Sequence, residues 1–163
     1  KNHVKNALVA LGSTGNSSLR RKLYRYADSI GFKLINAISS TAIVSPSVKM
    51  GTGNCVMDKV VIHADTYIGN NNIFNTGCII EHDCVIGSHT HVAPGAILAG
   101  GVKVGTLTHI GAGAVIIQGR TIGRNSIVGA GAVVINDIPD NSVCVGAPAR
   151  VIKYLMGDGN NEN

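Results

Sequence analysis

The sequence contains no tryptophan and only two phenylalanines, and aromatic residues make up 4% of the chain. Only 14% of its 163 residues are charged, and no apolar run approaches the roughly 18 residues of a membrane-spanning helix. A core built on large aromatic side chains is therefore excluded, and so is a membrane span. The apolar fraction of 45% excludes general disorder. We expect one domain, or one domain plus a fragment, with an interior of valine and isoleucine.

Clustered cysteines and a continuous basic surface are also missing. The four cysteines show neither C-x-x-C nor metal-ligand spacing, which predicts reduced, buried thiols in a cytoplasmic protein. The net charge is +5, and the basic residues are scattered apart from one cluster, Arg20 to Arg25. We therefore expect no nucleic acid partner, although a small phosphorylated ligand needs few cations. No signal peptide opens the chain, and the absence of an initial methionine favours a piece of something longer.

An apolar residue recurs at every sixth position without insertion from Val44 to Val134. Glycine or alanine often follows it, and the fifth position of each hexad is mostly small or β-branched. A period of six fits neither an amphipathic helix nor a plain strand, which repeats at two. It is typical of the hexapeptide repeat of a parallel β-helix. The sixteen positions are Val44, Met50, Val56, Ile62, Ile68, Phe74, Ile80, Ile86, Val92, Leu98, Val104, Ile110, Ile116, Ile122, Val128 and Val134.

The repeat predicts a triangular prism in which each hexad forms one short strand and a corner, and three hexads complete a coil. The recurring apolar residue points inward, and the sixteen hexads make about five coils, about 25 Å tall. Residues eighteen apart should therefore stack on one another. This places His82 between Ala64 and Gly100, Glu81 on His63, Asp83 on Asp65, and His91 on His109.

The two ends of the chain depart from the hexads. Residues 7–11 read as a strand, residues 18 to about 30 as a serine-capped helix ended by Gly31, and residues 32–38 as a second strand. This α/β unit should cover the first coil, because exposed solenoid ends invite edge pairing. After Pro139 the chain should fold back on the last coil, and its tail should be disordered.

Three stretches carry a specific resemblance: ALGSTGNSSLRRKLYRYADSIGFKLINAI at 10–38, IEHDCVIGSHTHVAPGAILAGGVKVG at 80–105, and VGAPARVI at 145–152. Together they resemble the hexapeptide-repeat sugar acetyltransferases, which include sialic acid O-acetyltransferases and bacterial UDP-4-amino-sugar N-acetyltransferases. The resemblance covers about residues 6–152. It implies a left-handed coil, acetyl-CoA as co-substrate, and a bacterial cytoplasmic homotrimer with active sites between subunits.

The sequence departs from that family at its beginning. There, a complete Rossmann-like domain precedes the prism, and its opening βαβ unit helps to hold the sugar nucleotide. We therefore expect residues 1–40 to be a partial α/β fragment of such a domain. Residues 41–152 should form the β-helix with its C-terminal extension, and residues 153–163 the disordered tail.

Acetyl transfer needs a base, and histidine suits this near neutral pH. The resemblance assigns that role to His82, with Asp83 orienting its ring; Glu81 is the rival for Asp83. A backbone N–H at Gly100 would bind the acetyl oxygen. His91 matches a second histidine near the acetyl group, and a purely structural role for it stays equally open.

A groove for coenzyme A should be lined by small side chains. The resemblance places it along the column of Ala112 and Ala130, between two subunits. Arg150 and Lys153 either meet the phosphates of coenzyme A or are solvated, and Asn75 is expected to contact the acceptor.

A metal site is not expected. Hexapeptide carbonic anhydrases bind zinc through three histidines, but the histidine spacings of nineteen, seven, two and eighteen here do not fit. The hypothesis is N-acetylation of a UDP-4-amino sugar for cell-surface glycan synthesis. O-acetylation of sialic acid or another sugar is an alternative, and so is a non-catalytic β-helix scaffold. Serine acetyltransferase is disfavoured, because an α/β unit replaces its helical amino-terminal domain.

Overall fold

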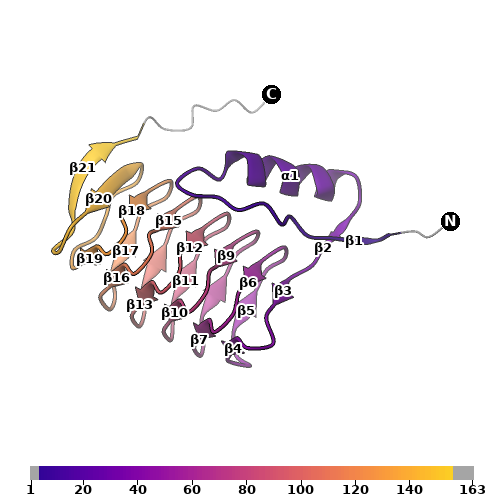
Figure 1. The fold of residues 1–163 in the computed structure, drawn as a ribbon, viewed down its shortest axis with the longest axis horizontal. Coiled ribbons are helices and arrows are strands. Elements are labelled where there is room, and N and C mark those ends of the chain that lie inside the picture. The colour runs from indigo at the N-terminus through magenta and orange to yellow at the C-terminus, as the bar shows by residue number, and fades with distance from the viewer. Residues whose placement is uncertain (1–3, 156–163) are drawn as a thin grey trace.

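A tall, three-sided solenoid dominates the computed structural model, which describes residues 4–155 (Figure 1). Nearly all of its strands are two residues long and recur every six residues, as the hexads predict. The second residue of each strand is the recurring apolar one, and from Ile62 to Val134 these side chains are buried. Burying one such side chain contributes about 1.5–3 kcal/mol. The solenoid is the predicted left-handed parallel β-helix.

The strands of the solenoid form three sheets, one on each side of the prism. The first, which we call the covered sheet, consists of β3 (Ala37–Ile38), β6 (Cys55–Val56), β9 (Ile73–Phe74), β12 (His91–Val92), β15 (His109–Ile110), β18 (Ile127–Val128), β20 (Ser142–Val145) and β21 (Arg150–Tyr154). Helix α1 (Ser18–Ser29) and the segment before it lie along this side (Figure 1). Strand β21 folds back antiparallel on β20, which confirms the predicted return after Pro139.

The other two sheets carry opposite kinds of outward side chain. The apolar sheet presents isoleucine and valine outward and consists of β4 (Ile43–Val44), β7 (Val61–Ile62), β10 (Ile79–Ile80), β13 (Ile97–Leu98), β16 (Val115–Ile116) and β19 (Val133–Val134). The polar sheet presents exposed and mostly polar side chains and consists of β5 (Lys49–Met50), β8 (Tyr67–Ile68), β11 (Val85–Ile86), β14 (Lys103–Val104) and β17 (Thr121–Ile122). Neighbouring strands pair in parallel with partners eighteen residues apart, as Ile79 does with Ile97.

The amino-terminal unit differs from the prediction in its strands. The single strand predicted over 32–38 is wrong: β2 (Lys33–Leu34) pairs with β1 (Asn6–Ala7), while β3 pairs with β6 and opens the prism. The solenoid therefore has about six coils rather than five. Strand β3 lies before the domain boundary predicted at residue 40, and that division of the chain stays a prediction.

Helix α1 begins and ends as predicted, but its capping residue is different. No serine side chain caps it; instead the N–H of Ser18 donates to Oδ1 of Asn16 at 2.8 Å. Gly31 follows the helix with φ +87°, a conformation that glycine adopts without strain.

The prediction of a disordered tail from residue 153 is wrong at its start. Lys153 and Tyr154 belong to β21, where they pair with Val143 and Ser142. Residues 156–163, the rest of the predicted tail, lie outside the described residues.

Two asparagines at the fifth position of their hexads link the first coils. The N–H of Asn54 donates to Oδ1 of Asn36 at 2.9 Å, and the N–H of Asn72 donates to Oδ1 of Asn54 at 2.8 Å. The N–H of Thr90 continues the series to Oδ1 of Asn72 at 2.7 Å. This ladder satisfies three buried backbone N–H groups, which would destabilise the fold if they were left unpaired.

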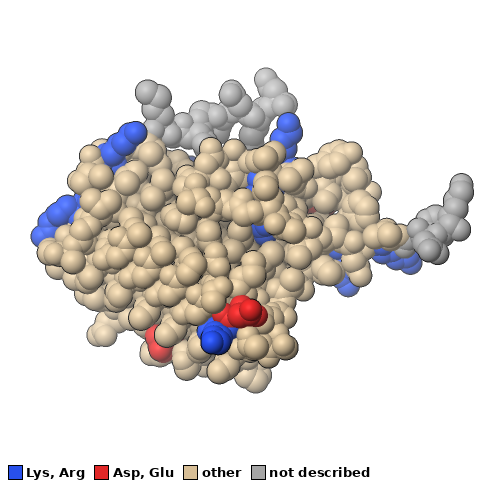
Figure 2. All heavy atoms as spheres, in the orientation of Figure 1, with Lys and Arg blue, Asp and Glu red and all other residues tan. Residues whose placement is uncertain are grey.

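Charged side chains are sparse on the face drawn in Figure 2, where the lysines and arginines lie apart from one another. This view shows no continuous basic surface of the kind that a polyanion needs. Over residues 4–155, no helix is long and apolar enough to cross a membrane.

Candidate active site

His82 and Asp83 form a hydrogen-bonded pair at one corner of the prism, in the turn between β10 and β11. Nδ1 of His82 lies 2.7 Å from Oδ2 of Asp83, and the two side chains are 63% and 64% exposed. The hydrogen bond to Asp83 raises the pKa of His82 above its ordinary value. It also fixes the proton on Nδ1, so that Nε2 is free to accept a proton. We call this edge, between the apolar and polar sheets, the histidine corner.

Gly100 lies one coil from His82, directly against its ring. A Cβ atom at Gly100 would come within 2.7 Å of both Cε1 and Nε2 of His82. The N–H of Gly101 donates to the carbonyl of His82 at 2.8 Å. The predicted stack is therefore correct, and only glycine at position 100 leaves the imidazole its present place.

Glu81 points to His63 and does not hold the ring of His82. Its Oε1 lies 3.8 Å from Nε2 of His63 on the neighbouring coil. The two side chains are 38% and 50% exposed, so this contact contributes little to stability. Asp83, rather than its rival Glu81, makes the short hydrogen bond to His82.

His91 is only 8% exposed and is held from both sides of its ring. Its Nδ1 donates to the carbonyl of Ser13, and its Nε2 lies 3.3 Å from Nδ2 of Asn75. Burial lowers the pKa of His91 below its ordinary value. The ring is therefore a neutral Nδ1–H tautomer, and Nε2 is its acceptor. Its predicted stack on His109 is also present, with ring centroids 4.9 Å apart.

A groove of small side chains runs beside His91 along the corner between the covered and apolar sheets. Its volume is about 500 Å³, and residues 14 and 15 close one side. Ala112 and Ala130, predicted to line a coenzyme A site, both lie on its floor with Pro94. We call this the pantetheine groove, after the arm of coenzyme A that we expect a groove along Ala112 and Ala130 to hold.

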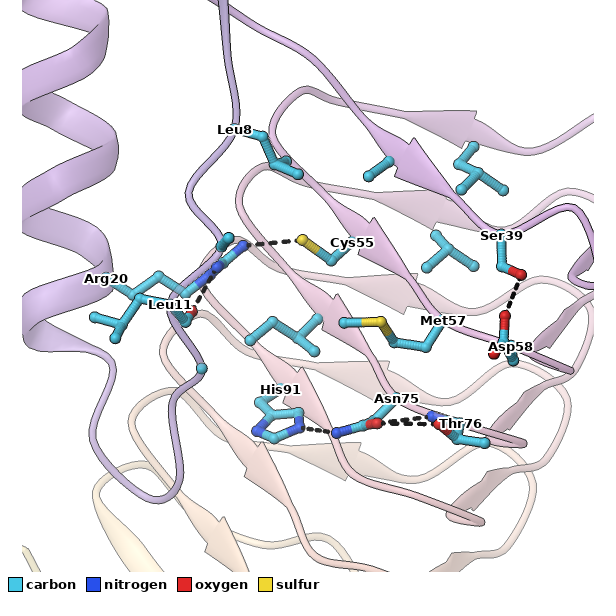
Figure 3. A pocket seen from close by; sticks show the side chains of 16 residues that line it. Leu8, Leu11, Arg20, Ser39, Cys55, Met57, Asp58, Asn75, Thr76 and His91 are labelled. Carbon is cyan, nitrogen blue, oxygen red and sulfur yellow. Dashed lines mark hydrogen bonds between the residues drawn. The ribbon is translucent and has the colours of Figure 1, made fainter.

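A second cavity lies between residues 8–12 and the covered sheet, and sequence reasoning missed it (Figure 3). Its volume is about 560 Å³, and its lining includes Met57, Asp58, Asn75 and His91. Asn75 and His91 also line the pantetheine groove, so the two hollows meet at this pair. We call it the segment cavity. The fold of residues 8–12 over the sheet creates it, and the hexad pattern carries no signal for that.

The histidine corner and the pantetheine groove occupy different corners of one prism. His82 follows a strand of the apolar sheet, whereas Ala112 and Ala130 each follow a strand of the covered sheet. Neither His82 nor Asp83 lines the groove or the segment cavity. The residues predicted for the base and those predicted for the coenzyme A groove therefore do not come together within one chain.

The remaining predicted residues lie apart from this arrangement. Arg150 and Lys153 lie on β21, and neither lines the pantetheine groove. Arg150 donates instead to the carbonyl of Ala149 at 3.0 Å. Their contact with coenzyme A phosphates stays a prediction. Within residues 4–155, no three His, Cys, Asp or Glu side chains are grouped so that they could hold a metal ion.

The fold and the corner histidine define a hexapeptide-repeat transferase. The family model for the bacterial transferase hexapeptide, described as six repeats, matches residues 83–118. A variant of perosamine N-acetyltransferase from Caulobacter crescentus, in complex with CoA and GDP-perosamine, is 47% identical with a TM-score of 0.84. The match covers 86% of this chain and 67% of that one.

Two further solved structures are similar. The acetyltransferase domain of PglB from Neisseria gonorrhoeae FA1090, in complex with acetyl coenzyme A, is 38% identical with a TM-score of 0.82, over 85% of this chain and 68% of that one. WeeI from Acinetobacter baumannii AYE is 29% identical with a TM-score of 0.82, over 88% of this chain and 74% of that one. The chain belongs to the hexapeptide-repeat sugar acetyltransferases.

Proposed function

We propose that this chain transfers an acetyl group from acetyl-CoA to the amino group of a nucleotide-linked 4-amino sugar. The observation that carries the proposal is the pair at the histidine corner, where Asp83 orients His82 and leaves Nε2 exposed. Perosamine N-acetyltransferase, the 47% identical relative, was crystallised with CoA and GDP-perosamine, which favours nitrogen over oxygen as the acceptor atom. UDP is our first expectation for the nucleotide, and GDP is the competing one.

In this reaction His82 acts as general base. Its Nε2 takes a proton from the sugar amine while the nitrogen attacks the thioester carbonyl carbon. The carbonyl electrons move to oxygen, where the N–H of Gly100 stabilises the charge. Collapse of this intermediate forms the amide and expels the coenzyme A thiolate, which takes the proton back from the His82 imidazolium. Asp83 stabilises the imidazolium between these two steps.

The two hollows supply places for the substrates. The pantetheine groove would hold the acyl carrier along Ala112 and Ala130, and the segment cavity would hold the amino sugar. Their meeting point at His91 and Asn75 is where the thioester and the amine would come together. There Nδ2 of Asn75 donates one N–H to Nε2 of His91, and its second N–H would be available to the reactants.

A homotrimer would complete the site. The outward side chains of the apolar sheet, from Val61 to Val133, are half-buried aliphatic groups that nothing in residues 4–155 covers. Three prisms that pack this sheet about a threefold axis bring the histidine corner of one copy to the groove corner of the next. His82 of one subunit would then face His91 and Asn75 of its neighbour.

Mixed trimers test this arrangement. His82→Ala removes the base, and Ala112→Trp fills the groove, so each variant alone should lose activity. When the two variants are co-expressed in equal amounts and assemble at random, half of the grooves are open and half of the facing subunits carry His82. About one quarter of the sites therefore have both, and the mixture should regain about one quarter of the wild-type rate. An inactive mixture that still forms trimers would place the whole site within one chain.

Substrate assays test the acceptor. We expect acetyl-CoA to be consumed with a UDP-linked 4-amino sugar or with GDP-perosamine, and His82→Ala to lower the rate by at least about 100-fold. Turnover of sialic acid alone would support the O-acetylation alternative. Failure to bind acetyl-CoA in calorimetry would support the scaffold alternative.

A further inference from the structure

Arg20 is a charged residue enclosed by the fold. Its side chain leaves helix α1 and is only 2% exposed. Figure 3 shows it passing between the segment that carries Leu11 and the strand that carries Cys55, at the wall of the segment cavity. The guanidinium finds no carboxylate within salt-bridge distance among residues 4–155.

Backbone carbonyls surround the guanidinium instead. Nη1 donates to the carbonyls of Val9 and of Leu11, the latter at 2.7 Å. Nη2 donates to the carbonyl of Gly53 and Nε to that of Asn71, each at 3.4 Å. The first pair belongs to the segment above the covered sheet, and the second pair belongs to the prism. Arg20 therefore ties these two parts of the chain together with one planar group.

A buried cation with no carboxylate partner in residues 4–155 is a costly way to join two segments, because no opposite charge in that part of the chain repays its desolvation. An apolar side chain of similar length would fill the same space, but it would donate to neither segment. The position therefore calls for a reason beyond packing.

The segment that Arg20 holds also positions His91. Val9 and Leu11 lead directly to Ser13, whose carbonyl accepts the hydrogen bond from Nδ1 of His91. Residues 8–12 also form the roof of the segment cavity. A shift of this segment would change the cavity and release Nδ1 of His91 at the same time.

We propose that Arg20 is a positioning residue for the acceptor: it fixes residues 9–13 over the covered sheet and thereby selects the Nδ1–H tautomer of His91. The inference rests on the proposed function for its kinetic consequence, but its structural part does not. The charge of Arg20 also favours an acceptor that carries negative charge, such as a nucleotide diphosphate, at the cavity wall.

Two variants of Arg20 and one control test the proposal. Arg20→Met removes the donors and the charge, Arg20→Lys keeps the charge but not the planar fork, and Lys22→Met changes an exposed residue of the same helix. Nitrogen-15 NMR of the imidazoles in the ligand-free protein should show His91 protonated on Nδ1 in wild type and Lys22→Met. In Arg20→Met a substantial fraction should be protonated on Nε2, and Arg20→Lys should lie between.

Kinetics supply the second measurement. With GDP-perosamine or a UDP-linked 4-amino sugar, the KM of the acceptor should rise by at least about tenfold in Arg20→Met, while the KM of acetyl-CoA changes less than about twofold. An unchanged His91 tautomer in both Arg20 variants would overturn the proposal, even if their melting temperatures fall. If Arg20→Met does not fold, Arg20→Lys decides by the same two measurements. If wild-type protein acetylates neither sugar, the proposed function fails, and the NMR result still decides the role of Arg20.

Discussion

Gly100→Ala is a small change that should disable the site without unfolding the prism. The added methyl group would sit 2.7 Å from Cε1 and Nε2 of His82 and 3.4 Å from its Cδ2. Non-bonded heavy atoms do not approach to 2.7 Å unless they hydrogen-bond, so the ring must turn away. Because the His82 side chain is 63% exposed, it has room to turn, and the 2.7 Å hydrogen bond to Asp83 would then break.

The size of the effect follows from what the ring loses. A positioned general base contributes about 10²–10⁴-fold to a rate, so we expect kcat to fall by about 100-fold or more. The melting temperature should change little, because the clash is relieved by an exposed side chain rather than by the backbone. The nearest counterpart in the same column is Gln118, one coil further on, and Gln118→Ala serves as the control.

The assay is release of free coenzyme A from acetyl-CoA in the presence of the sugar acceptor, together with thermal melting of each variant. A Gly100→Ala enzyme with near-wild-type kcat would refute the reasoning, since it would mean that the ring position against Gly100 does not matter. A large fall in melting temperature would refute its structural half, because the clash would then be relieved by the coil itself.

Three other predictions concern protonation and access. Asp83→Asn replaces the carboxylate that raises the pKa of His82 with a neutral amide, so the acid limb of the kcat/KM profile should move to lower pH while the maximum falls. Burial lowers the pKa of His89 to about 4, so its neutral form stabilises the fold above pH 6.5 and this stability is lost as pH falls towards 4. His89→Asn, which tolerates the φ of 60° there, should flatten the pH dependence of thermal melting over that range. Cys55 lines the segment cavity, and the other three cysteines do not. GDP-perosamine or a UDP-linked 4-amino sugar should therefore slow the alkylation of Cys55 selectively. Mass spectrometry of the labelled peptides would measure this.

The prism could be predicted from the sequence because its determinants are periodic. Each hexad repeats the same inward aliphatic residue, so strand positions, register and stacking follow from counting, as the contact of His82 with Gly100 confirms. The pattern did not predict what its exceptions do. Asn54 and Asn72 stand where most hexads have a small or β-branched residue, and only the structure shows that they form the buried ladder that joins the first coils.

The amino-terminal segment could not be predicted in the same way. Residues 8–13 have no repeat and no regular secondary structure, and their path is fixed by single contacts over long sequence separations. Arg20 bonds to Gly53 and Asn71, and Ser13 bonds to His91 across 78 residues. Such contacts leave no trace in composition or periodicity, so the segment cavity that they create was missed.

The separation of His82 from the pantetheine groove was, by contrast, implicit in the numbering. His82 and Ala112 both come two residues after an inward apolar side chain, so each occupies the same place in its hexad. Their numbers differ by thirty, which is one full coil of eighteen plus two hexads, and this sets them at different corners of the triangle. If His82 is the base and this groove holds the acyl carrier, as we propose, the two must come from different copies of the chain. The mixed trimers of His82→Ala and Ala112→Trp therefore test the arithmetic together with the assembly.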